Sequence, residues 1–181
     1  MSMYPRPPDH AGQRRGKPVS SSFLPNIIGA HLLFERRGRV LLGLRPPDAL
    51  FAANVWHVPA GHVERESVRA CAVREAGEEL GVIVEEPDLE LVHTVHLLGA
   101  DAEDAVPRLQ LFFRAHQWRG EPRVMEPDRC VEWRWWPLHS LPDPTVEYTV
   151  AALEGIASGW SYTVSLPHSF VGMVGQRPAR R

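Results

Sequence analysis

Cysteine is scarce in this chain of 181 residues, which contains only Cys71 and Cys130. Two cysteines cannot build the disulfide framework of a small secreted fold, and no Cys-x2-Cys pair predicts a zinc site. We therefore expect both to be inert packing residues. The chain also contains no run of about 18 apolar residues and no basic segment followed by an apolar one. We expect no membrane partner and no leader, and we predict a reduced, cytoplasmic protein.

Excess charge of either sign is also absent. The sequence has 20 basic residues (Lys and Arg) and 22 acidic ones, which gives a formal net charge of −2. A balance this even does not favour nonspecific binding to nucleic acid, so no nucleic-acid partner is expected. Hydrophobic residues make up 44% of the chain, enough for one domain with a single core.

The two ends of the chain have a different composition from its middle. Residues 1–22 are rich in Pro, Ser, Gly and Arg and have no apolar period, which predicts a disordered N-terminal arm. Residues 163–181 also lack a period and are expected to form an irregular C-terminal tail. The folded domain should therefore span residues 23–162.

Within that domain, apolar patterns predict an α/β fold with a mixed sheet flanked by helices. Two β-prone runs, 26–34 and 39–45, are separated by a charged turn and predict a hairpin. Ser67 is a suitable N-cap and Gly81 a suitable left-handed C-cap for a helix between them. Further strands are expected at 55–58, 89–97, 108–118 and 131–136, and a second helix at 146–157.

The helix that ends at Gly81 has an acidic face. Glu75, Glu78 and Glu79 fall within an arc of roughly 100° on a helix of 3.6 residues per turn. Like charges at this spacing cost roughly 0.2–0.5 kcal/mol per pair, and the last turn is the negative end of the helix dipole. One reading is a solvated face with an internal pair to Arg74. The other is a site for Mg²⁺ or Mn²⁺, which prefer oxygen ligands.

The residues around this face resemble the Nudix box, G-x5-E-x7-R-E-U-x-E-E-x-G-U, where U is aliphatic. The matching residues, in order, are Gly61, Glu66, Arg74, Glu75, Glu78, Glu79, Gly81 and Val82. Two departures stand out. Four residues instead of five separate Gly61 from Glu66, and Ala76 replaces a larger aliphatic residue.

The resemblance extends to residues 25–162. The segment 56–61 is similar to the strand that precedes the box in MutT-like members, and 118–136 is similar to a late loop and strand of the family. The resemblance implies a Nudix-type α/β/α sandwich with a mixed sheet. It also implies hydrolysis, with Mg²⁺ or Mn²⁺, of a nucleoside diphosphate linked to another group. The simplest substrate is a nucleoside triphosphate, cleaved to a monophosphate and pyrophosphate. A monomer or homodimer is expected.

The resemblance assigns roles to individual residues. The expected metal ligands are Gly61, Glu66, Glu75, Glu78 and Glu79. Arg74 is expected to orient Glu66 or Glu78, and Glu78 belongs to the catalytic group as well as to the metal site. Two general bases stay open, Glu75 and, in a later loop, Glu126.

Substrate contacts are less constrained by the sequence. The candidates are Trp56, His62, Phe113, Trp136 and Glu147. Aromatic residues in strands more often belong to the core. The segment before the last helix has no asparagine of the kind that MutT-type relatives use for oxidised guanine, and the signatures of other subfamilies are missing, which leaves a nucleoside triphosphate.

A second function from another class stays open. The chain could be a noncatalytic Nudix module that binds a nucleotide or a partner as a sensor, and the shorter loop between Gly61 and Glu66 is the feature that motivates it. Metal-dependent turnover separates the two functions.

Overall fold

The computed structural model describes residues 25–98 and 106–165. The predicted arm, 1–22, and most of the predicted tail lie outside these residues. The elements in chain order are β1 (Ile27–Arg36), β2 (Arg39–Leu44), β3 (Trp56–His57), β4 (Ala60–His62), α1 (Val68–Leu80), the 3₁₀ helix η1 (Glu86–Asp88), β5 (Leu89–Leu97), β6 (Arg108–Ala115), β7 (Glu132–Pro137), α2 (Glu147–Ala157) and β8 (Tyr162–Ser165).

Strand β1 is the centre of the sheet. It pairs in parallel with β6, from Ile27 opposite Arg108 to Phe34 opposite Ala115, and antiparallel with the short β4. Beyond β6, strand β5 runs antiparallel and β8 pairs with β5 in parallel. The predicted hairpin joins the end of β1 to β2, which also pairs with β3 and β7. The sheet is therefore mixed, as predicted.

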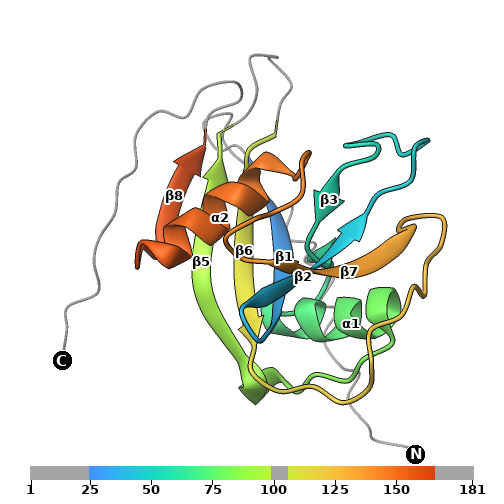
Figure 1. Ribbon diagram of the computed structural model, residues 1–181. Coiled ribbons are helices and arrows are strands. Elements are labelled where there is room, and N and C mark those ends of the chain that lie inside the picture. The colour runs from blue at the N-terminus through green and yellow to red at the C-terminus, as the bar shows by residue number, and fades with distance from the viewer. Residues whose placement is uncertain (1–24, 99–105, 166–181) are drawn as a thin grey trace, which may run out of the picture.

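The two helices cover opposite faces of this sheet, with α2 over β5 and β8 and α1 beside β1 and β4 (Figure 1). Because successive side chains of a strand alternate between faces, β1 serves both layers. Ala30, Leu32 and Phe34 pack in the core under α1, and Leu33 packs in the core under α2. This arrangement confirms the predicted α/β/α sandwich.

The structure corrects the expected end of the domain. Residues 162–165, which include the first part of the predicted irregular tail, form β8 and pair with 94–97 of β5. A four-residue strand is too short to show a period in the sequence, and its neighbour in the sheet supplies its hydrogen bonds. Strand β4 was missed for the same reason, and β6 ends at Ala115 rather than Trp118.

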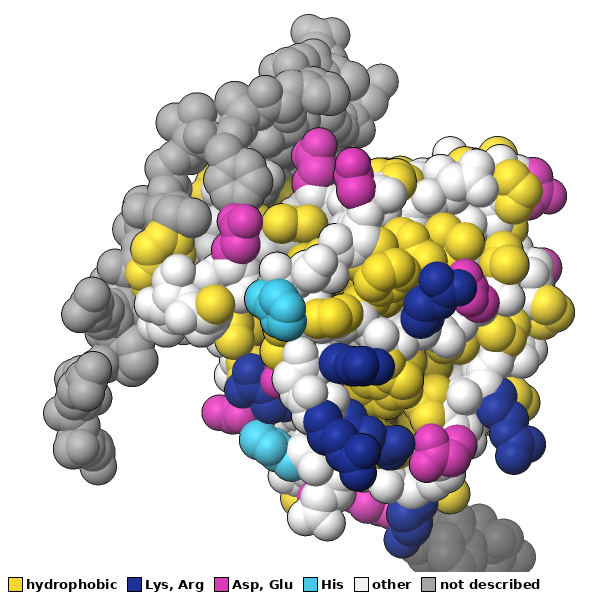
Figure 2. Space-filling view, in the orientation of Figure 1, with side chains coloured by type: hydrophobic (Ala, Val, Ile, Leu, Met, Phe, Trp, Pro, Cys, Tyr) yellow, Lys and Arg dark blue, Asp and Glu magenta, His cyan; other side chains and the backbone are white. Residues whose placement is uncertain are grey.

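Figure 2 shows acidic and basic side chains interspersed on the face that carries α2, with hydrophobic side chains between them. Several charged side chains of the described residues are paired: Arg134 lies 2.8 Å from Glu132, and Arg114 lies 3.2 Å from Glu35. Neither helix in the described part of the chain is long and apolar enough to span a membrane.

Candidate active site

Helix α1 has the two caps that its sequence predicts. The Ser67 side chain accepts a hydrogen bond from the Ala70 amide over 3.0 Å, which satisfies one of the free N–H groups of the first turn. Gly81 ends the helix with φ of 67°, in the left-handed region, and its amide bonds back to the last turn. Both predicted caps are confirmed, so the register of the acidic residues on this helix is fixed.

The acidic face of α1 lies partly inside the protein. Glu75 and Glu79 are buried, whereas Glu78 is exposed. The Ala60 amide donates a hydrogen bond to Glu79 Oε2 over 3.0 Å. Glu75 lies so close to Gly61 that a Cβ added at Gly61 would overlap the Glu75 carboxylate. Strand β4 therefore holds two carboxylates of α1 at its edge.

Arg74 joins three carboxylates. Its Nη2 lies 2.7 Å from Glu66 Oε1, and its Nη1 lies 2.6 Å from Glu75 Oε1 and 2.9 Å from Glu78 Oε2. These contacts are those expected of a residue that orients the carboxylates, which is the role predicted for Arg74. They also lower the pKa of Glu66 and raise the pKa of Arg74. Although the loop after Gly61 is one residue short, Glu66 still reaches Arg74.

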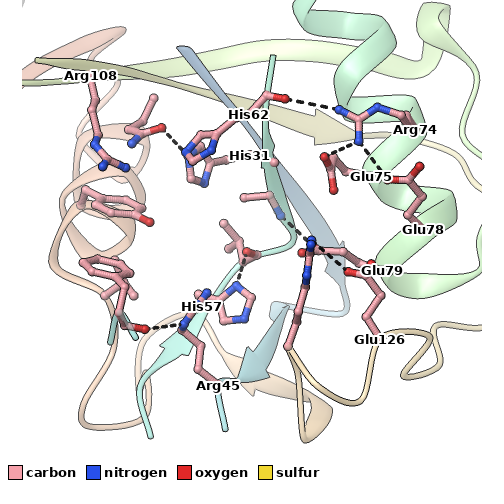
Figure 3. A pocket seen from close by; sticks show the side chains of 18 of the residues that line it. His31, Arg45, His57, His62, Arg74, Glu75, Glu78, Glu79, Arg108 and Glu126 are labelled. Atoms are coloured by element: carbon pink, nitrogen blue, oxygen red, sulfur yellow. Dashed lines mark hydrogen bonds and ion pairs between the residues drawn. The ribbon is translucent and has the colours of Figure 1, made fainter. Parts of the chain in front are cut away.

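A cavity of about 800 Å³ opens beside this cluster (Figure 3). Carboxylates from α1 and from a later loop form one side of it, and side chains from β1, β3, β6, α2 and the segment after β2 form the other. The lining includes Glu75, Glu78, Glu79, Glu126, Arg74, Gly61, His62, His31, His57, Arg45, Arg108 and Tyr148.

Burial and mutual repulsion act on the carboxylates of the cavity. Burial is the main cause that raises the pKa of Glu79, to about 8, and the negative charges of Glu75 and Glu126 add to it. The Ala60 hydrogen bond opposes the rise only in part. Burial also raises the pKa of Glu75, against the effect of Arg74. A cation in the cavity would favour the charged form of both carboxylates.

Glu126 comes from the loop before β7, and the structure brings it to the same cavity. The Met125 amide bonds to the Glu79 carbonyl over 3.3 Å, which ties this loop to the end of α1. Glu126 Oε2 is buried and has no hydrogen-bond partner among the described residues. Arg129 Nη1 lies 3.5 Å from it, close enough for attraction but too far for a good hydrogen bond. Within the described part of the chain, the hydrogen-bonding capacity of this atom is thus not satisfied.

These residues fit a hard divalent cation in their chemistry. Glu75, Glu79 and Glu126 offer oxygen atoms to one cavity, and one of those atoms, Glu126 Oε2, is buried without a partner. Within the described ranges, no three His, Cys, Asp or Glu side chains already stand in a metal-binding arrangement. Arg74 instead holds the oxygen atoms of Glu75 and Glu78. A bound ion would have to share these two carboxylates with Arg74.

The far side of the cavity contains two buried histidines that sequence reasoning missed. His31 Nε2 lies 2.8 Å from Gln110 Oε1, and the His31 ring stacks on Phe112 with centroids 4.6 Å apart. His57 Nδ1 lies 2.7 Å from the Val58 carbonyl. Burial lowers the pKa of each histidine to about 4. The sequence signal was a polar residue in an apolar strand, His31 in β1 and Gln110 in its partner β6.

Comparison with known proteins identifies the family of this chain. The family model described as NUDIX domain matches residues 25–153. The chain belongs to the Nudix family. Its structure is similar to a MutT Nudix hydrolase from Burkholderia pseudomallei, with 34% identity and a TM-score of 0.64, over 72% of this chain and 97% of that one. The predicted family is thereby confirmed.

Two more distant relatives of this Nudix chain differ in their sequence identity to it and in the share of their own length that it covers. A NAD-capped RNA hydrolase NudC from Stutzerimonas stutzeri is 29% identical over 128 residues, which are 70% of this chain and 42% of that protein. The chain thus spans less than half the length of the curated relatives it matches. The Nudix domain of Shewanella oneidensis NrtR, solved with ADP ribose, is 17% identical with a TM-score of 0.58, over 77% of this chain and 92% of that one. That similarity shows the fold alone.

The structure separates the predicted Nudix box residues into two groups. Gly61, Glu75, Glu78 and Glu79 line the cavity together with Arg74. Glu66 does not line it. Its Oε1 accepts two hydrogen bonds from Arg74, so the structure gives Glu66 the position of a residue that orients Arg74 rather than that of a direct ligand.

Of the predicted substrate residues, only His62 lines the cavity. Phe113 is buried in the core under α1, because its neighbour Phe112 takes the other face of β6. Trp56 and Trp136 pack edge to face, with centroids 5.2 Å apart, in the layer of β2, β3 and β7. Glu147 begins α2 and is exposed. The substrate role of these four stays a prediction, and none of them is part of the cavity lining.

Proposed function

We propose that this Nudix enzyme hydrolyses the diphosphate linkage of a nucleoside diphosphate joined to another group, with Mg²⁺ or Mn²⁺ as cofactor. The simplest substrate is a nucleoside triphosphate, which would give a monophosphate and pyrophosphate. The observation that carries the proposal is the convergence of Glu75, Glu79 and Glu126 on one cavity. Two of these carboxylates have a raised pKa there, a cost that a bound cation would offset.

The residues that would hold the cation are Glu75, Glu78 and Glu79, with the Gly61 carbonyl beside them. A bound divalent ion neutralises phosphate charge and lowers the pKa of a coordinated water. Arg74 keeps the carboxylates in place through its planar guanidinium, and Glu66 holds Arg74 from the opposite side. Glu66 and Arg74 therefore act through position.

Of the two candidate bases, the geometry favours Glu126. Glu75 Oε1 accepts a hydrogen bond from Arg74, whereas Glu126 Oε2 has none. In the proposed step a water oxygen bonds to phosphorus, the bond from phosphorus to the leaving phosphate oxygen breaks, and Glu126 takes the proton of the water. The leaving phosphate departs with the electron pair of the broken bond.

The names of the relatives add further compounds to the set of candidate substrates. One group of relatives is named for hydrolysis of NAD-capped RNA, and one structural neighbour was solved with ADP ribose. Both are nucleoside diphosphates joined to another group, so NADH and ADP-ribose belong beside the nucleoside triphosphates. We further propose a small-molecule substrate, a cytoplasmic location, and a monomer or homodimer.

The test is product identification by chromatography, with Mg²⁺, with Mn²⁺ and with EDTA. The panel contains ribo- and deoxynucleoside triphosphates, 8-oxo-dGTP, ADP-ribose, NADH and dinucleoside polyphosphates. Metal-dependent release of a nucleoside monophosphate from one class supports the proposal and names that class. Nucleotide binding without turnover on the whole panel would favour the noncatalytic sensor instead.

A further inference from the structure

Some of the positive charge in the cavity lining is not paired with carboxylates of the described residues. Four arginines line it, and two of them face acidic partners: Arg74 holds its three glutamates, and Arg129 lies beside Glu126. Arg45 and Arg108 remain. Within the described residues, neither of these two forms an ion pair with a carboxylate. Arg45 Nε donates to the Phe51 carbonyl over 2.8 Å, and this bond leaves both terminal nitrogens of the guanidinium for a ligand.

The two arginines lie on the side of the cavity away from the acidic helix face, as Figure 3 shows. Arg45 follows β2 and Arg108 begins β6, so residues far apart in the sequence converge here. The charges of both arginines act on Tyr148, which lies in the first turn of α2. Arg45 and Arg108 each favour its ionised form, although burial outweighs them and raises its pKa. The cavity therefore has an acidic side and a basic side.

The histidines of the cavity lining add no positive charge to the basic side. His31 and His57 stay neutral near pH 7, because burial lowers the pKa of each to about 4 and the charge of Arg45 lowers that of His57 further. Two guanidinium groups thus supply the positive charge of this side. Guanidinium groups bind phosphate through paired hydrogen bonds.

Aromatic rings next to these charges indicate which part of a substrate lies here. The Phe51 side chain is exposed, and the Arg45 guanidinium lies 5.8 Å from the centre of its ring. Tyr148 meets the edge of the His31 ring, with centroids 5.4 Å apart. Aromatic faces favour stacking with a nucleobase. The nucleoside half of a substrate therefore suits the basic side, and its diphosphate suits the acidic side with a cation.

We propose that Arg45 and Arg108 bind a second anionic group of the substrate, a phosphate on its nucleoside half, across the cavity from the carboxylates that act on the diphosphate. This proposal rests on the proposed function and narrows its substrate class. The preferred substrate is a nucleoside diphosphate derivative with an additional phosphate on the ribose of that nucleoside.

NADH and NADPH test this proposal, because NADPH differs only by a phosphate on the adenosine ribose. Wild type should have a kcat/KM for NADPH at least about tenfold above that for NADH, mainly through a lower KM, since a charge-assisted hydrogen bond contributes roughly 1.5–3 kcal/mol. Arg45→Gln and Arg108→Gln should each lower this ratio toward one. The Lys variants should keep part of it. Arg39→Gln, which removes the same charge from an exposed site on β2 outside the cavity lining, should not change the ratio.

Equilibrium binding keeps the test independent of turnover. Calorimetric titration in EDTA measures the affinity of both dinucleotides without a metal, and NADPH should bind at least about tenfold more tightly than NADH. A ratio near one for wild type, or a preference that both Gln variants keep, would overturn the proposal. Failure to bind either dinucleotide would overturn it as well. The proposed function fails by a different result, the absence of metal-dependent turnover across the full substrate panel.

Discussion

The Ala60 amide and the Glu79 carboxylate form a hydrogen bond of 3.0 Å that joins β4 to the last turn of α1. This bond places a buried carboxylate at the wall of the cavity, where burial raises its pKa to about 8. At neutral pH the charged form of Glu79 is therefore costly without a cation. The position of this residue is better explained by metal binding than by stability.

Glu79→Gln separates these two roles. The amide oxygen of Gln can still accept from Ala60, but Gln lacks the negative charge that holds a cation. We expect turnover to fall at least about 100-fold, or roughly 2.7 kcal/mol, while the melting temperature stays equal or rises. Glu154→Gln, an exposed change on α2, is the matched control and should alter neither quantity. Full activity in Glu79→Gln would refute the metal assignment.

Adding Mg²⁺ should stabilise the folded protein, since the ion binds the native carboxylate cluster and not the unfolded chain. At a concentration ten times its Kd, the gain is about 1.4 kcal/mol. Differential scanning fluorimetry should show a melting temperature several degrees higher with Mg²⁺, and EDTA should reverse the shift. Glu79→Gln should abolish it. An equal shift in wild type and Glu79→Gln would mean that the ion binds elsewhere.

Gly61→Ala tests the contact between β4 and α1. The new Cβ would overlap the Glu75 carboxylate, so Glu75 must move and its bond to Arg74 must change. We expect both turnover and the free energy of unfolding to fall. Gly77→Ala is the control within α1, where an added Cβ meets nothing within 4 Å. It should stabilise the helix by about 0.5–1 kcal/mol. Full activity of Gly61→Ala would show that the contact is not needed.

The acidic side of this cavity could be predicted from the sequence because its residues follow one helix. Ser67 and Gly81 define the ends of α1, so the spacing of Glu75 and Glu79 determines their common face. Glu126 was also predicted to reach the cluster, from its place in the late loop. The local sequence pattern and the family resemblance were enough to predict the acidic side of the cavity.

The basic side could not be predicted, because its residues meet only through the sheet. Arg45 follows β2, Arg108 begins β6 and Tyr148 lies in α2, and no sequence period joins them. His31 approaches Gln110 because β1 and β6 pair in parallel, across 79 positions of sequence. Strand alternation shows that Phe113 and its neighbour Phe112 face opposite ways, and both pack in the core, one on each side of the sheet.

Arg74→Lys tests whether the planar guanidinium matters or only its charge. Lysine retains the positive charge but cannot reach Glu66 and Glu75 with the paired donors that Arg74 uses. We expect kcat to fall by roughly 10- to 100-fold, with a smaller change in Mg²⁺ affinity, because the carboxylates lose orientation but not charge. Steady-state kinetics over a range of Mg²⁺ concentrations measures both. Wild-type kcat in Arg74→Lys would show that charge alone suffices.

The buried histidines predict how stability depends on pH. His31 and His57 have a pKa of about 4 in the folded protein and about 6.5 when unfolded. Acid therefore protonates the unfolded chain first, so their contribution is complete above about pH 6.5 and is lost as the pH falls toward about 4. Glu79 has the opposite sign. Its folded pKa of about 8 exceeds the unfolded value of 4.5, so acidification below about pH 8 relieves its cost.

The measurement therefore belongs in the Glu79→Gln background, in EDTA, where the opposing titration of Glu79 is gone and that of Glu75 is common to the proteins compared. Urea unfolding should show a loss of up to roughly 2 kcal/mol per histidine between about pH 7.5 and about pH 5. Adding His31→Gln should remove about half of that loss, whatever the change does to stability at neutral pH, because the comparison concerns the slope. If the two proteins lose stability equally on acidification, then His31 is not held neutral by its burial between β1, β6 and Tyr148.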